Sequence, residues 1–150
     1  MLTIIILILI ALLGYTLFHQ FNAFRQIQIR ENHQHLFYAT PVIIAIVFLE
    51  VGFEFGETFI QYALFILIAI NFVAIPFTSG LSKDFIYYKS NKRGLAGFIP
   101  KSKALTDVIG SQIEKEDDYF TVDFSFEKEI ISLRFSNEQF VAVHQIISRT

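Results

Sequence analysis

Three long apolar segments account for most of the first half of the chain. They run from Leu2 to Phe18, from Leu36 to Phe53 and from Thr58 to Phe77, and Glu50 is their only charged residue. Each can cross a hydrocarbon layer of roughly 30 Å as a helix that rises about 1.5 Å per residue. Because a segment in lipid must satisfy its backbone hydrogen bonds internally, the pattern predicts three transmembrane helices within residues 1–78.

The ends of these segments carry further signals. Gly52 and Gly56 are expected to supply flexible backbone where the second and third helices reverse as a hairpin. Pro41 is expected in the first turn of the second helix, where its missing N–H costs little, and Pro76 is expected to help end the third. Residues 19–35 are expected either to continue the first helix into the interface or to lie on it.

Strict alternation marks the clearest strands of the second half. Large apolar residues alternate with polar ones from Phe120 to Glu127, and again from Ile131 to Phe135 after a charged turn. This pattern predicts a half-buried antiparallel hairpin. Ser136 stands three residues before Gln139, a capping-box spacing that predicts a terminal helix. Three apolar residues share one face of that helix: Phe140, Val143 and Ile147.

Weaker strand signals lie closer to the apolar half. Asp84 to Lys89 is rich in aromatic residues, and residues 90–94 read as a hairpin turn. A second strand is then expected from Leu95 to Ile99, ended by Pro100, and a third from Asp107 to Glu114.

Charge separates the two halves in the same way as hydropathy. Apolar residues make up 53% of the chain, and residues 1–78 contain two basic and four acidic groups against ten of each in residues 79–150. This division predicts a membrane anchor over residues 1–78 and one small α+β domain over residues 79–150. The near-neutral total argues against nucleic-acid binding, and the absence of Cys excludes thiol chemistry and Cys-type metal sites.

The basic residues also predict an orientation. Arg25 and Arg30 stand between the first two segments, the link to the third has no basic residue, and four basic residues follow within positions 83–93. Because cytoplasmic loops carry an excess of Lys and Arg, we expect the N-terminus outside and the C-terminal domain in the cytoplasm. The first segment lacks a preceding basic stretch, which favours a retained helix over a cleaved signal peptide.

The second half resembles a known kind of domain. The Lys-Ser-Asn-Lys-Arg-Gly turn at residues 89–94, the Gly97 to Pro100 segment, the hairpin from Phe120 to Phe135 and the terminal helix follow the order of PH-like domains on small bacterial membrane proteins. The resemblance covers about residues 80–150. It implies a PH-like antiparallel sheet closed by the C-terminal helix, in a bacterial inner (plasma) membrane protein, and a scaffold that binds proteins or lipid headgroups without catalysis.

Basic residues cluster just after the third segment. Positions 79–103 contain six basic residues and one acidic residue, whereas positions 104–150 contain four basic and nine acidic residues. Such a cluster can hold anionic lipid or a partner, at about 1 kcal/mol per well-placed charge, or it can merely enforce topology and solubility. Lys89, Lys92 and Arg93 are the first choice for contact. The full cluster is Lys83, Lys89, Lys92, Arg93, Lys101 and Lys103.

Other polar features receive plainer interpretations. Asn71 lies deep in the third segment, where an amide needs a partner, so it is expected to make a helix–helix contact within the chain or in a homo-oligomer. The acidic run from Glu114 to Asp118 reads as a solvated loop. His33 and His35 have too little support for a metal site, and the sequence predicts no metal, no cofactor and no catalytic residue.

The sequence therefore predicts a non-enzymatic integral membrane protein that presents a small cytoplasmic domain at the membrane surface. Its expected partners are membrane lipid and a protein, with a larger membrane protein as one candidate. Two alternatives stay open. One is a homo-oligomeric effector or pore subunit gated by the domain, and the other is an immunity or accessory subunit of a larger membrane complex.

Overall fold

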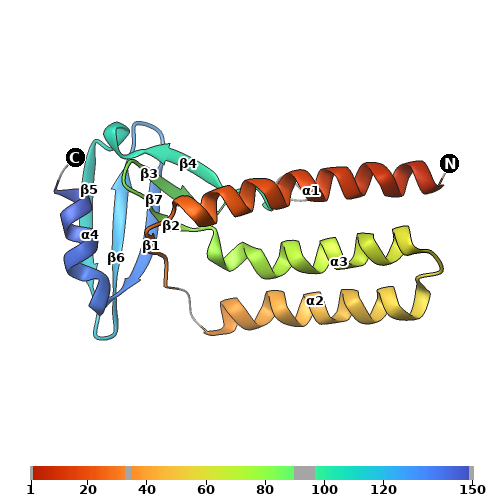
Figure 1. The fold of residues 1–150 in the computed structure, drawn as a ribbon. Coiled ribbons are helices and arrows are strands. Elements are labelled where there is room, and N and C mark those ends of the chain that lie inside the picture. Colours follow the sequence, from red (N-terminus) through yellow and green to blue (C-terminus); the bar gives the residue numbers. More distant parts are fainter. Residues whose placement is uncertain (1, 33–34, 90–96, 149–150) are drawn as a thin grey trace.

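The computed structural model of the protein describes residues 2–32, 35–89 and 97–148. Three long helices extend from one side of a smaller α+β region (Figure 1). The helix α3 lies between the other two and packs against both. All three are long and apolar enough to cross a membrane, which confirms the predicted spans to that extent. Their bounds are α1 Leu2–Gln26, α2 His35–Phe55 and α3 Phe59–Ala74.

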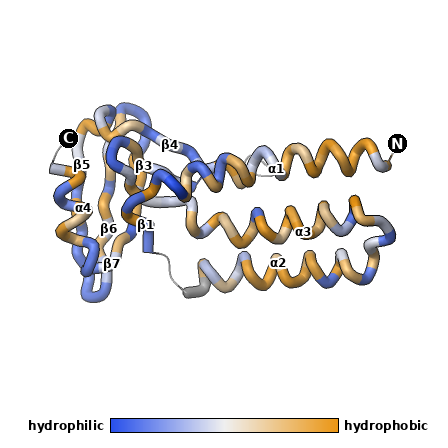
Figure 2. Tube along the Cα trace, in the orientation of Figure 1, coloured by the Kyte–Doolittle hydropathy of each residue, from blue (hydrophilic) through white to orange (hydrophobic). Residues whose placement is uncertain are grey.

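The surfaces of these helices are apolar nearly all round. Figure 2 shows mostly hydrophobic positions along the helices, with hydrophilic ones mainly near their ends, whereas the α+β region is mixed. Large side chains such as Ile4 and Phe59 remain 63% and 86% exposed. Exposed apolar surface of this extent is unfavourable in water and normal against acyl chains, so the burial pattern agrees with helices solvated by lipid.

The connection between α2 and α3 differs from the prediction for Gly52. This glycine lies within α2 rather than in the turn, and a Cβ built on it would be 2.6 Å from the Cβ of Phe65. Its missing side chain therefore lets α2 and α3 approach closely. The chain reverses after Phe55, and Thr58 begins α3 through a capping box with Gln61.

The two prolines behave differently. Pro41 is not in the first turn, because α2 begins at His35 and Pro41 stands inside the helix. Interior prolines are tolerated in membrane helices because neighbouring groups re-satisfy the freed backbone. Near the end of the third span, α3 stops at Ala74 and a short 3₁₀ helix, Ile75–Phe77, contains Pro76. The expected stop is confirmed.

The loop between the first two spans contributes a strand that the sequence did not predict. Helix α1 continues to Gln26, and the two-residue strand β1, Ile29–Arg30, then pairs antiparallel with β2, Gly80–Leu81. Gly80 has a φ of 150°, and a Cβ on it would lie 2.3 Å from the carbonyl oxygen of Ile29. Glycine is needed at this position because no other residue permits this close approach.

The α+β region contains two antiparallel sheets. The first has the order β1-β2-β3-β4 and the second the order β5-β6-β7. Their remaining strands are β3 Phe85–Tyr88, β4 Lys101–Ala104, β5 Gly110–Lys115, β6 Tyr119–Ser125 and β7 Ile130–Ser136. The predicted domain boundary at residue 79 stays a prediction, and the first sheet takes β1 from the N-terminal side of it.

The predicted hairpin is present as β6 and β7. Phe120 pairs with Phe135 and Phe124 with Ile131, and all four side chains are at most 5% exposed. The capping box of Ser136 is also present, and the helix α4, Phe140–Ile147, follows it. Apolar side chains from both sheets and Val143 of α4 form one core.

The prediction of a strand from Leu95 to Ile99 is wrong for its described part. Residues 90–96 lie outside the described ranges, Gly97 to Ile99 form a turn, and the strand begins only at Lys101, after Pro100. The ring of Phe98 packs edge-on against Phe72 of α3, with 5.0 Å between centroids. Phe98 therefore uses its apolar ring to contact helix α3 and not to pack in a sheet. The third expected strand is shorter than predicted and begins at Gly110 as β5.

Candidate functional site

A buried polar network joins α1 to α3. The side-chain amide of Asn71 donates to the carbonyl oxygens of Leu13 at 3.2 Å and Leu67 at 2.9 Å. The hydroxyl of Thr16 donates to the Asn71 Oδ1 at 2.6 Å. The structure therefore places Asn71, fully buried, at a helix–helix contact within the chain. Such bonds contribute about 0.6 to 1.7 kcal/mol each in a membrane.

The same network reaches the α+β region through Gln20. Its side-chain amide donates to the carbonyl oxygen of Phe98 at 2.9 Å and to that of Asn71 at 3.4 Å. The hydroxyl of Tyr87 on β3 donates to Gln26 at the end of α1. These contacts hold the segment before β4 and the end of β3 against the helices. Sequence reasoning missed Gln20 because the first span was ended at Phe18.

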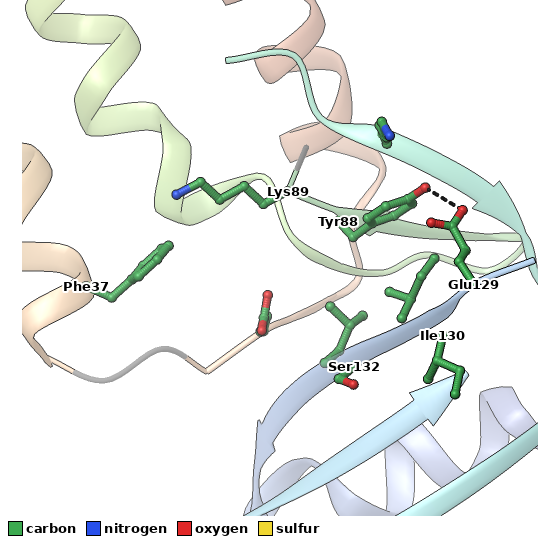
Figure 3. Close-up of a pocket in the computed structure, with 10 residues that line it drawn as sticks. Phe37, Tyr88, Lys89, Glu129, Ile130 and Ser132 are labelled. Atoms are coloured by element: carbon green, nitrogen blue, oxygen red, sulfur yellow. Dashed lines mark hydrogen bonds between the residues drawn. The ribbon is translucent and has the colours of Figure 1, made fainter. Parts of the chain in front are cut away.

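A pocket of about 350 Å³ opens where the α+β region meets the start of α2. Figure 3 shows Phe37 of α2 on one side, Tyr88 and Lys89 at the end of β3, and Glu129 to Ser132 beneath them. Lys101, the first residue of β4, also lines it. The pocket combines two lysines and two glutamates, Glu31 and Glu129, with aromatic and aliphatic side chains, and it lies beside the start of α2.

The six basic residues of the predicted cluster divide into four groups. Lys89 and Lys101 line the pocket, with their Nζ atoms 4.9 Å from the Phe37 ring centroid and 5.9 Å from that of Tyr88. Lys83 is exposed in the turn between β2 and β3. Lys92 and Arg93 lie outside the described residues.

The sixth residue, Lys103, is engaged in an ion pair. Its Nζ lies 2.6 Å from Glu129, and the hydroxyl of Tyr88 donates to the same carboxylate at 3.3 Å. The hydrogen bond from Lys103 holds the pKa of Glu129 below its usual range. Glu129 thus remains charged and partly offsets the two lysines of the pocket.

Glu31 lies where the two sheets meet. Its backbone N–H donates to the Ser79 carbonyl at 3.1 Å, and the N–H of Asn32 donates to the Arg134 carbonyl at 2.7 Å. The Glu31 carboxylate accepts from the Arg134 backbone and the Ser79 hydroxyl. Burial nevertheless raises its pKa to about 7. No sequence pattern indicates this role of Glu31, because its partners are distant along the chain.

The remaining sequence candidates are not assembled into a site in the part of the chain that the structure describes. Within residues 2–32, 35–89 and 97–148, no three His, Asp or Glu side chains gather as a metal site would require. His33 lies outside those ranges. The acidic run from Glu114 to Asp118 is exposed at the β5–β6 turn.

Comparison of the chain with protein-family models, curated proteins and solved structures finds no match. The function must therefore be inferred from the geometry itself.

Proposed function

We propose that this protein is a non-enzymatic, multi-pass membrane protein whose α+β region, a PH-like domain, binds the headgroup of an anionic lipid at the membrane surface. The observation that carries the proposal is the pocket lined by Lys89 and Lys101. Two antiparallel sheets followed by the helix α4 support the PH-like assignment.

The position of the pocket favours lipid over a soluble ligand. The Nζ of Lys89 lies 4.9 Å from the ring of Phe37, at the end of a helix apolar enough to span a membrane. Phe98, just before Lys101, packs against α3. Both lysines are thus held near headgroup depth, where each can contribute about 1 kcal/mol toward an anionic surface.

Ligand-observed NMR on the full chain in neutral detergent tests this proposal. The probe is glycerophosphoglycerol, the headgroup of phosphatidylglycerol without its acyl chains. We expect saturation transfer to the probe that weakens as salt is raised, because the attraction is electrostatic. The double variant Lys89→Glu/Lys101→Glu is expected to abolish it. The full chain is required because β1 belongs to the first sheet.

Lys115→Glu provides the control, since it reverses the charge of one lysine at an exposed position on β5, outside the pocket. It should bind the probe as the wild type does. Equal transfer in the double variant and the wild type would reject the headgroup site. In that case, capture of one protein by a photo-crosslinker at position 101 would favour the protein-partner alternative.

We further propose that the N-terminus faces outward across a bacterial plasma membrane and that the α+β region is cytoplasmic. Arg25 and Arg30 precede α2 on the same side of the helices as the α+β region, which fits the positive-inside bias (Figure 1). A tag placed after Thr150 should resist protease added to intact spheroplasts and be cleaved after lysis. Cleavage before lysis would reverse the proposed orientation.

A further inference from the structure

A second pocket, of about 460 Å³, lies among the three membrane helices. Helices α1 and α2 pack mainly against α3, which lies between them (Figure 1), and the pocket lies where side chains of all three helices meet. Apart from Gln20 and Thr78, the residues that line it are apolar. We call this the helix groove. The lining residues used below are Phe21, Phe24, Ala45, Ala69, Ala74 and Phe77.

Small side chains form the floor of the helix groove and aromatic rings form its walls. Ala45 and Ala69 line the helix groove and are only 4% and 5% exposed, so they lie at its deep side, where their short side chains leave room. Phe21 and Phe24 are 56% and 38% exposed and stand at the open side. Along α1 the groove extends from Leu17 to Phe24, about 10 Å at 1.5 Å per residue. This shape fits a stretch of one acyl chain.

Two arginines stand over the aromatic walls. The guanidinium carbon of Arg30 lies 4.1 Å from the ring centroid of Phe24 and 6.0 Å from that of Phe77. That of Arg25 lies 5.8 Å from the ring centroid of Phe21. Within the described ranges, no salt bridge engages either arginine. An exposed cation thus sits at the end of the helix groove nearest the α+β region, where a headgroup would lie.

We propose that the helix groove binds one acyl chain of an anionic phospholipid whose phosphate is held by the guanidinium of Arg30. Filling the groove with hydrocarbon gains van der Waals contact but no transfer energy, because the surrounding tails are equally apolar. Selection among lipids must therefore come from the headgroup. A guanidinium suits this task because its donors match two phosphate oxygens at once.

This site is separate from the pocket lined by Lys89 and Lys101, which we call the lysine pocket. Arg30 and Glu31 are consecutive residues at β1, and successive side chains on extended backbone point in opposite directions. Glu31 lines the lysine pocket, whereas Arg30 lies over Phe24 and Phe77. The inference therefore does not depend on the proposed function.

Native mass spectrometry of the full chain, released from neutral detergent with phosphatidylglycerol and phosphatidylcholine of equal chain length, tests the inference. The wild-type helix groove and its variants are compared in the Lys89→Glu/Lys101→Glu background, so that the pocket lined by these two lysines adds no second site for the anionic lipid. The wild type should retain one phosphatidylglycerol with a preference of about tenfold, which corresponds to about 1.4 kcal/mol. Arg30→Gln should retain both lipids equally. Ala74→Phe, which fills the helix groove, should retain neither.

Two controls separate this site from general effects. Ala11→Phe makes the same enlargement at an exposed position on α1 outside the groove and should behave as the wild type does. The chain with Lys89 and Lys101 intact should also keep the preference, because the lysine pocket adds only a further site for the anionic headgroup. Equal retention of both lipids by the wild type, or an unchanged preference in Arg30→Gln, would overturn the inference. Arg30 is exposed, so this variant tests the idea even if Ala74→Phe fails to fold.

Discussion

Replacing Glu31 with Gln should remove a pH-dependent weakness at the junction of the two sheets. Burial raises the pKa of Glu31 from 4.5 to about 7, despite hydrogen bonds from Ser79 and Arg134 and the nearby charges of Arg134 and Lys89. The folded state therefore holds this proton more tightly than the unfolded chain does. The associated stability is complete below about pH 4.5 and is lost as pH rises through about 7.

The size of the effect follows from the shift. The difference in pKa between the unfolded and the folded state corresponds to a change of about 3 kcal/mol in the free energy of unfolding from low to neutral pH. The equilibrium constant for opening of the junction between the two sheets would change by about two orders of magnitude. In the part of the chain that the structure describes, Arg134 on β7 and Lys89 after β3 place positive charge near the carboxylate. Both favour its ionised form, so the net loss at neutral pH reflects desolvation.

Hydrogen exchange read by mass spectrometry can measure this loss locally. After correction for the intrinsic pH dependence of exchange, amide protection around Ser79 and Arg134 should fall from pH 4.5 to 7.5 in the wild type. Glu31→Gln should show a flat profile, since its side chain has no proton to lose in this range. Glu116→Gln, at the exposed β5–β6 turn, should retain the wild-type slope. Equal slopes in Glu31→Gln and the wild type would refute the reasoning.

Three further substitutions test the packing. Asn71→Leu should lower the stability of the helices by about 1–2 kcal/mol, because its bonds to Leu13 and Leu67 are lost; an unchanged thermal midpoint in detergent would contradict this. Gly80→Ala should cost at least about 1 kcal/mol and release β1, visible as faster amide exchange there, because of its positive φ and the crowded Ile29 carbonyl. Phe124→Ala should lower the free energy of unfolding by about 3–5 kcal/mol and make β6 and β7 sensitive to limited proteolysis, because Phe124 is fully buried. Resistance to the protease equal to that of the wild type would contradict this.

Periodicity was sufficient for elements that depend on their own residues. Long apolar runs with one charged residue among them, Glu50, predicted the three helices, since lipid requires apolar side chains and internal backbone hydrogen bonds. The alternation from Phe120 to Phe135 predicted β6 and β7, because a half-buried hairpin imposes a period of two. The capping box at Ser136 located the start of the last helical segment for a similarly local reason.

The candidate sites were only partly accessible from the sequence. The basic cluster named Lys89 and Lys101, but their meeting around a pocket with Phe37 depends on the packing of α2 beside β3. The cluster also included Lys103, which the structure pairs with Glu129. From the sequence, Arg30 was expected only to influence the orientation in the membrane. Its contacts could not be predicted, because the rings of Phe24 and Phe77 come from α1 and from the segment after α3.

The sequence by itself determined which helices are long and apolar enough to cross a membrane and which strands have a buried face, because the transfer energy of each residue and the local periodicity decide both. Only the tertiary structure decided that Ile29–Arg30 is a strand, that Gln20 bonds to Phe98 and that Glu31 is buried between sheets. Each of these depends on a partner about 50 or more residues away along the chain. A two-residue strand or a single polar side chain carries no periodic signal, so its role appears only when that distant partner is in place.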